Sequence, residues 1–191
     1  MIGRISVMLA ALASIAALAV LPARATTLQK FDLADISNRA DTIVRGKVMD
    51  VEQSVMALGG GQIPYVTYRV KVKEMLKGAP DATKGGVSIV EFSIVGSLKP
   101  AGVNDGVQHV DIFEDVPKFQ LGKEYVLFMS PESSAGLSSP IGLGQGAFDV
   151  FAAGKDEIIV NQFDNKGLGA GIEGPVSWGE FKTAVSAVMN Q

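Results

Sequence analysis

The alternation of apolar and polar residues from Tyr65 to Met75 constrains the fold of this chain more than any other feature. Every second position is apolar, at Val66, Tyr68, Val70 and Val72, and the positions between them hold Thr67, Arg69, Lys71 and Lys73. Successive side chains of a β-strand point to opposite faces, so this period of two predicts a strand with one buried and one solvated face. At ~3.3 Å per residue the strand spans roughly 36 Å, which is long enough to curl around a small barrel.

Other segments carry strand patterns as well. We expect strands over Ile43–Val55, Val87–Val95, Val107–Phe113, Glu124–Ser130, Ile141–Phe151 and Glu157–Val160. Several of the gaps between them are too short to hold a helix, which predicts a largely antiparallel sheet. Val87–Val95 is apolar on both faces and is predicted to be central in the sheet. Gly46 interrupts its strand and predicts a bulge or a close backbone approach.

Two helices are predicted, one before the strands and one after them. Asp32 is the expected N-cap of a short first helix, which ends at Asp41. Ser177 and Glu180 have the spacing of a capping box at the start of an amphipathic helix over 177–190. The apolar face of that helix consists of Trp178, Phe181, Ala184, Val185 and Val188. We expect this face to cap the barrel, and the alternative is a docking helix for another protein.

Residues 1–25 have the pattern of a secretory signal peptide. A positively charged start precedes the uncharged apolar run Ile5–Leu21, and Ala23-Arg24-Ala25 is a small-residue cleavage site. The alternative is a retained membrane anchor, for which the run has about the minimum length. Cleavage leaves one domain over 26–191, which we expect in the periplasm or outside the cell and not on a membrane.

Composition excludes several kinds of site. The chain has no Cys, which excludes a disulfide scaffold, a thiolate zinc site, an iron–sulfur cluster and a cysteine nucleophile. The formal net charge of -3 argues against a nucleic-acid partner, because phosphate binding needs clustered Lys and Arg. His109 is the single histidine, so one chain cannot build a His-rich metal site. We expect no cofactor and no resident metal.

Four motifs carry a resemblance to a known family. They are A-D-x-I-V-x-G-x-V at Ala40–Val48, L-K-G at Leu76–Gly78, F-x-x-G-x-x-Y-V-L-F at Phe119–Phe128 and GLGQGAFDV at Gly142–Val150. Their order resembles the OB-fold-like barrel of the netrin and tissue-inhibitor-of-metalloproteinases type, in the form of exported bacterial domains. The resemblance implies a mainly β fold, a small antiparallel OB-like barrel. Members of the inhibitor family carry a Cys at the mature N-terminus, where this chain has Thr26.

One group of polar residues is a candidate ligand-binding site. His109 and Asp111 share a face of the expected strand, and Asp105 lies in the turn before it. One imidazole and two carboxylates can hold a divalent ion. The alternative is a solvated edge strand whose charges discourage pairing with other sheets.

Three functions remain open. The first is a non-enzymatic exported binding module, whose partner is a protein or a small molecule held in the groove of the barrel. The second is a peptidase inhibitor acting through Thr26 and Thr27, because a free α-amine and the first carbonyl can ligate zinc. The third is a divergent hydrolase with His109 as its base and a serine from the loop Pro131–Pro140, although the G-x-S-x-G elbow is lacking. We assign no catalytic residue.

Overall fold

The fold is mainly β, with one large antiparallel sheet. A computed structural model describes residues 29–98, 103–104, 107–108 and 116–190, and the structural statements below concern these residues. In chain order the elements are α2 (Leu33–Arg39), β1 (Thr42–Leu58), β2 (Gly61–Lys77), β3 (Ala82–Lys84), β4 (Val87–Val95), β5 (Val103–Asn104), β6 (Val107–Gln108), β7 (Glu124–Met129), the 3-10 turn η1 (Leu143–Gln145), β8 (Ala147–Ala153), β9 (Asp156–Asn161), β10 (Val176–Ser177) and α3 (Trp178–Met189).

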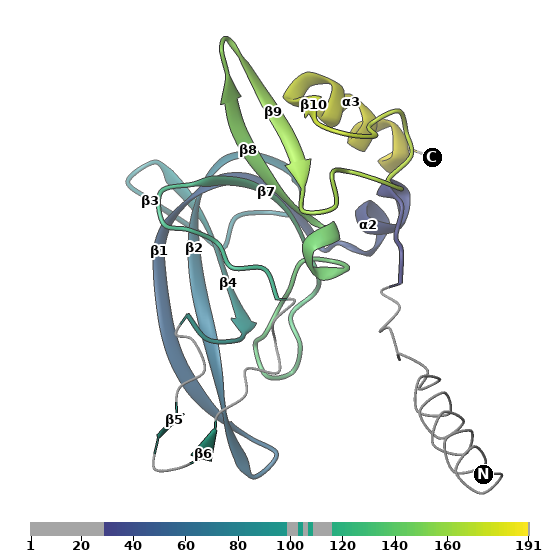
Figure 1. Ribbon diagram of the computed structural model, residues 1–191. Helices are drawn as coiled ribbons and strands as arrows, with labels where there is room; N and C mark the ends of the chain where they lie inside the picture. The colour runs from purple at the N-terminus through teal and green to yellow at the C-terminus, as the bar shows by residue number, and fades with distance from the viewer. Residues whose placement is uncertain (1–28, 99–102, 105–106, 109–115, 191) are drawn as a thin grey trace, which may run out of the picture.

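The large sheet contains eight strands in the order β10-β9-β8-β7-β1-β2-β4-β3, and every neighbouring pair is antiparallel (Figure 1). The prediction of a mainly antiparallel β fold with a short first helix and a C-terminal helix is therefore confirmed. The sheet is open in the described part of the chain, since no ladder joins β3 to β10. These edge strands are three and two residues long and offer little backbone for closure, so a closed barrel is not observed.

β1 and β2 form a long hairpin that carries the predicted alternation. Val66, Tyr68 and Val70 are buried on the core face, as expected. The register shifts between Arg45 and Gly46, which confirms the predicted bulge. A Cβ at Gly46 would lie 2.5 Å from the carbonyl oxygen of Lys71, so a side chain at this position would collide with β2.

Two sequence predictions need correction. β4 is not central: it lies between β2 and the short edge strand β3, and Glu91 on its second face is exposed. The polar Glu91 and Ser93 alternate with buried Phe92, which is the pattern of a half-solvated strand. The segment predicted as one strand over Ile141–Phe151 begins instead as η1, because Gly142 adopts a left-handed conformation with φ of 61°. Of the predicted strand Val107–Phe113, only β6 is described.

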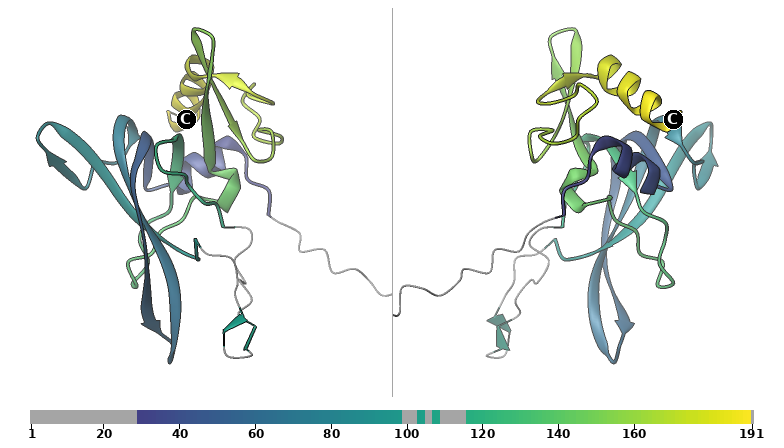
Figure 2. Two further views of the ribbon diagram at one scale, coloured as in Figure 1. Left: turned by 60° about the vertical axis from the view of Figure 1, so that its left-hand side comes forward. Right: turned by 90° about the vertical axis from the view of Figure 1, so that its right-hand side faces the viewer.

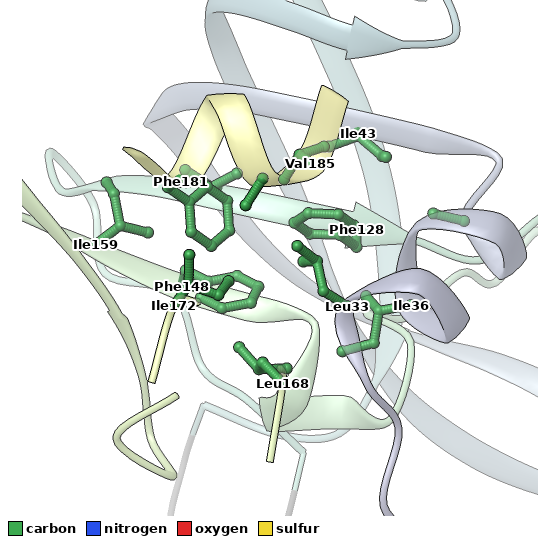
Figure 3. Close-up of a cluster of buried hydrophobic side chains, with 13 residues drawn as sticks. Leu33, Ile36, Ile43, Phe128, Phe148, Ile159, Leu168, Ile172, Phe181 and Val185 are labelled. Carbon is green, nitrogen blue, oxygen red and sulfur yellow. The ribbon is translucent and has the colours of Figure 1, made fainter. Parts of the chain in front are cut away.

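The sheet carries a hydrophobic core on each face. Consecutive residues of β1 divide between the cores, with Ile43 in one and Val44 in the other. The first core lies under the two helices and contains Leu33, Ile36, Ala40, Ile43, Val126, Phe128, Phe148, Ile159, Leu168, Ile172, Phe181, Ala184 and Val185 (Figure 3). The second core gathers β1, β2, β4 and β7 around the ring of Phe119.

α3 lies across the sheet beside α2, on the side of β8 and β9 (Figure 2). The predicted capping box is present, because the Ser177 hydroxyl accepts from the Glu180 N–H and the Glu180 carboxylate accepts from the Ser177 N–H. Phe181 and Val185 are fully buried, so the predicted apolar face packs on the sheet. Within the described ranges, no helix has the length and apolar character needed to cross a membrane.

The side chain of Arg45 ties α3 to three strands. Its Nε atom lies 2.6 Å from the Glu124 carboxylate on β7, and its Nη2 atom lies 2.5 Å from that of Glu157 on β9. The guanidinium also stacks over Trp178 at 4.6 Å from the ring centroid. Desolvation lowers the pKa of Arg45, but hydrogen bonds from the guanidinium to Glu157 and Glu124 outweigh it, and the pKa is raised. Arg45 is only 5% exposed, so it stays charged inside the protein because it is paired.

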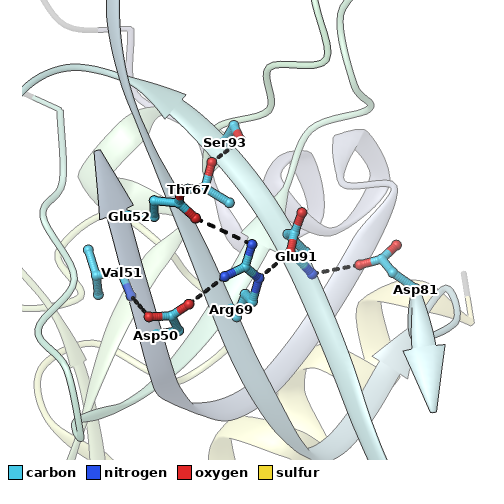
Figure 4. A network of polar contacts seen from close by, with 8 residues as sticks. All are labelled: Asp50, Val51, Glu52, Thr67, Arg69, Asp81, Glu91 and Ser93. Carbon is cyan, nitrogen blue, oxygen red and sulfur yellow. Dashed lines mark hydrogen bonds and ion pairs between the residues drawn. The ribbon is translucent and has the colours of Figure 1, made fainter. Parts of the chain in front are cut away.

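A second arginine makes similar contacts on the surface. Arg69 pairs with Asp50 on β1, with Glu91 on β4 at 2.5 Å, and with Glu52 at 3.5 Å (Figure 4). Its side chain is 36% exposed, so water solvates the charges and the pairs add little stability.

Replacing these two arginines should have very different effects. Arg45→Met removes the guanidinium partner of the Glu124 carboxylate, which is only 15% exposed and keeps the Lys73 ammonium at 2.5 Å as its remaining partner. We expect the free energy of unfolding to fall by about 2 kcal/mol, less than for a fully buried pair because Glu157 reaches solvent. Arg69→Met, the matched control, should leave the urea midpoint close to that of the parent protein. Equal losses in the two variants would contradict the structural role given to Arg45.

Candidate functional site

The site residues predicted from sequence lie outside the described part of the chain. This applies to Asp105, His109 and Asp111, and also to Thr26 and Thr27. The proposed ligand-binding group and the inhibitory N-terminus therefore stay predictions. Among the residues that are described, no three His, Asp or Glu side chains gather closely enough to hold a metal ion.

The described residues contain a polar cavity of about 310 Å3 beside the second core. The segment before β7 forms one wall, and β8 with the residue after β9 forms the other. The lining consists of Pro117, Lys118, Phe119, Gln120, Lys123, Tyr125, Gly144, Ala147, Asp149, Phe151 and Gln162. We call it the Asp149 cavity. Its volume is at the small end of the range for ligand pockets, so it suits a small molecule.

Sheet register brings the central residues of this cavity together. Tyr125 on β7 lies directly opposite Asp149 on β8, and directly opposed residues share a face of the sheet. Phe151 lies two residues further along β8 and therefore points to the same face. The sheet itself thus positions one aromatic residue across the strand pair from the carboxylate and another two residues along β8.

The aromatic floor of the cavity is rigid. Phe119 packs edge-on against Tyr125 at a centroid distance of 4.9 Å and against Tyr68 at 5.2 Å. The Tyr125 hydroxyl accepts a hydrogen bond from the Gln120 N–H at 3.0 Å, which holds the ring and the loop together. Burial raises the pKa of Tyr125, Gln120 opposes that shift, and the charge of Asp149 adds to it, so the phenol stays protonated.

Asp149 is the unusual group of this site. The carboxylate is half-buried, and within the described residues it accepts no hydrogen bond and forms no ion pair. Burial raises the pKa of Asp149, and the positive charge of Lys123 opposes the shift. A desolvated carboxylate without a partner costs stability, and such groups are concentrated at functional sites.

A second cavity, of about 330 Å3, adjoins the serine-rich loop after β7. The serine hydroxyls here form hydrogen bonds within the loop. Ser138 donates to the carbonyl of Ser130 at 2.7 Å, and Ser133 accepts from the Leu137 N–H at 3.1 Å. The described lining of this cavity contains no His, Asp or Glu that could act as a base. The hydrolase alternative, which relies on His109, stays a prediction.

Sequence reasoning missed the Asp149 cavity. The sequence predicts a strand over Ile141–Phe151 and a family motif over Gly142–Val150, and Asp149 is the single charge in an apolar run (AFDVF) within them. That isolated charge was the available signal. No sequence pattern indicated that Tyr125 would lie opposite it, because this pairing depends on sheet register.

Neither a protein-family model nor a curated protein sequence matches this chain significantly. The resemblance to the netrin and tissue-inhibitor-of-metalloproteinases barrel therefore stays a prediction.

Removing the Asp149 charge should stabilise the protein. A raised pKa means that the native state binds a proton more tightly than the unfolded chain, so stability falls as pH rises from the ordinary pKa of aspartate through the raised one. Asp149→Asn escapes this loss, and we expect its melting midpoint at pH 7 to exceed that of the parent by about 1 °C. The gain should vanish near pH 3, where the Asp149 carboxyl of the parent protein is protonated in both the native and the unfolded state. A lower midpoint at pH 7 would mean that the carboxylate has a stabilising partner.

Proposed function

We propose that this protein is an exported, non-enzymatic binding module that holds a small zwitterionic molecule in the Asp149 cavity. The observation that carries the proposal is the half-buried Asp149 carboxylate, which lacks a partner among the described residues and is flanked by aromatic rings. A ligand ammonium group pairs with this carboxylate and recovers the cost of its desolvation.

The surroundings of Asp149 favour a particular ligand. The exposed ring of Phe151 favours a cation or an apolar group of a ligand beside the Asp149 carboxylate. Lys118 and Lys123 are exposed at the rim and repel a ligand of net positive charge. They attract a carboxylate instead. An amino acid with an apolar side chain, or a similar amphoteric molecule, can pair its ammonium group with Asp149 and its carboxylate with the two lysines.

The lining also supports binding over catalysis. Among the described residues around the cavity there is no Ser, Thr or His, so nucleophile and base are lacking for the usual triad. Asp149 is the single carboxylate among these described lining residues, and binding a cation uses that group without any chemical step.

Export is part of the same proposal and is supported by the sequence. The apolar run Ile5–Leu21 and the cleavage pattern Ala23-Arg24-Ala25 are typical of a leader that is removed. The intact mass of the protein recovered from the culture medium or periplasm of a bacterial host should correspond to a chain that starts at Thr26. Recovery of the full chain in the membrane fraction would favour the retained anchor.

Three related compounds test the ligand class by calorimetry. L-phenylalanine carries both charges, 3-phenylpropanoate lacks the ammonium group, and phenethylamine lacks the carboxylate. We expect L-phenylalanine to bind and each of the other two to bind about tenfold more weakly or worse, because each loses a charge-assisted contact. Binding should weaken as pH falls through the raised pKa of Asp149.

Variants locate the binding site. Asp149→Asn should abolish the preference for the ammonium group, and Phe151→Ala should weaken binding several-fold by removing an exposed ring. Asp156→Asn is the matched control, since it removes the same charge from an exposed position on the neighbouring strand. Equal binding of L-phenylalanine and 3-phenylpropanoate, or equal losses in the two Asp variants, would overturn the proposal.

A further inference from the structure

The end of the β1–β2 hairpin, Val55–Leu58 with Gly61–Pro64, projects beyond the ends of β4 and β7 as a two-stranded arm (Figures 1 and 2). β7 pairs with β1 only as far as Lys47, and Val48 makes the last backbone bonds on that side, with Lys123 and Gly122. Beyond Val48, β1 runs on to Leu58 with β2 as its single described neighbour. The outer edge of β1 is therefore an unpaired strand edge in the described part of the chain.

Sheet geometry identifies the residues whose backbone faces outward along this edge. The Pro64 carbonyl accepts from the Gly96 N–H, on the side away from β1. Directly opposed residues of an antiparallel pair exchange both hydrogen bonds or neither, so Val55, which is opposite Pro64, points its N–H and carbonyl outward. By alternation Gln53 and Ala57 do the same.

This edge lacks the usual protection against pairing. Lysine, proline or an inward charge normally blocks an edge strand, but Gln53, Val55 and Ala57 are uncharged. Closer to Val48, where the contacts with β7 end, the outward N–H of Val51 donates to the Asp50 carboxylate at 3.0 Å. This N–H is therefore not available to another strand. Val55 is 58% exposed and Leu58 is 45% exposed, so the open part is also apolar.

The open edge is complementary to itself. In an antiparallel pairing about a two-fold axis at Val55, Gln53 lies opposite Ala57 of the second copy, and Val55 lies opposite its own equivalent. Glu52 then faces Leu58 of the second copy, so like charges are not opposed in this register. The exposed Val55 side chain, which meets water in one copy, lies against its own equivalent in the pair.

We propose that two copies of this protein pair through the outer edge of β1, with the two-fold axis at Val55, and join their sheets into one. The partner is a second copy because the register about Val55 aligns the outward backbone groups of the two copies, keeps Glu52 away from its equivalent and places the exposed Val55 side chain against itself. The contact covers a short stretch of strand and lies at the small end of interface sizes, so the dimer depends on protein concentration. It does not involve the Asp149 cavity.

A single engineered cysteine tests this arrangement, because the protein itself has none. Cα atoms of a directly opposed hydrogen-bonded pair are about 5.5 Å apart, which is within the span of a disulfide. We expect purified Val55→Cys protein to form a covalent dimer rapidly under mild oxidation. In sedimentation experiments the parent protein should show a monomer–dimer equilibrium, which Val55→Lys shifts to monomer by placing like charges opposite each other.

Two control variants measure the background rate of cross-linking and check the pairing register. Leu121→Cys places a thiol at a position that is 66% exposed and outside the arm, so it measures collisional cross-linking. Met56→Cys lies next to Val55, but its equivalent in the second copy is at a diagonal position about 7–8 Å away, beyond easy bridging. Cross-linking of Val55→Cys at the rate of Leu121→Cys, faster cross-linking of Met56→Cys, or a parent protein that stays monomeric at millimolar concentration would each overturn the proposal.

Discussion

The pairing of β1 with β2 on one side and β7 on the other is the constraint on which the rest of this structure depends. β1 lies near the middle of the sheet order and sends neighbouring residues to opposite faces, with Ile43 in the core under the helices and Val44 in the core around Phe119. Arg45 follows and joins β1 to β7, β9 and α3 through two carboxylates and the Trp178 ring. Three consecutive residues thus hold both cores and the C-terminal helix in place.

The candidate site depends on the same pairing. β7 contributes Phe128 to the core under the helices and, three residues earlier, Tyr125 to the wall of the Asp149 cavity. Its register with β8 sets Tyr125 opposite Asp149. The carboxylate is held at half burial by strands that are themselves rigid, which is how a costly group is kept in position for a ligand. The cavity is therefore a consequence of how the two strands meet, and no flexible loop is needed to place Asp149.

Much of the fold could be predicted because its signals are local. The alternation over Val66–Val72 predicted the buried face of β2, and the pair Ser177 and Glu180 predicted the start of α3. Gly46 predicted a bulge because strand interiors disfavour glycine. The prediction of a central β4 is wrong because Glu91 and Ser93, which alternate with buried Phe92 in a mostly apolar segment, belong to a half-solvated face. η1 was missed because the left-handed turn at Gly142 is decided by the packing around it, which includes Phe31 and Gln145.

The sequence by itself determined most of the strand and helix segments, the buried face of β2, the helix caps and the exclusion of thiol chemistry. Each of these depends on residues within a turn or a few positions of one another. Tertiary structure alone decided that the described strands form an open sheet, that Arg45 is buried among its partners, and that Asp149 lies opposite Tyr125. These features join residues from separate strands, and strand register depends on the total free energy of packing, so no local pattern specifies them.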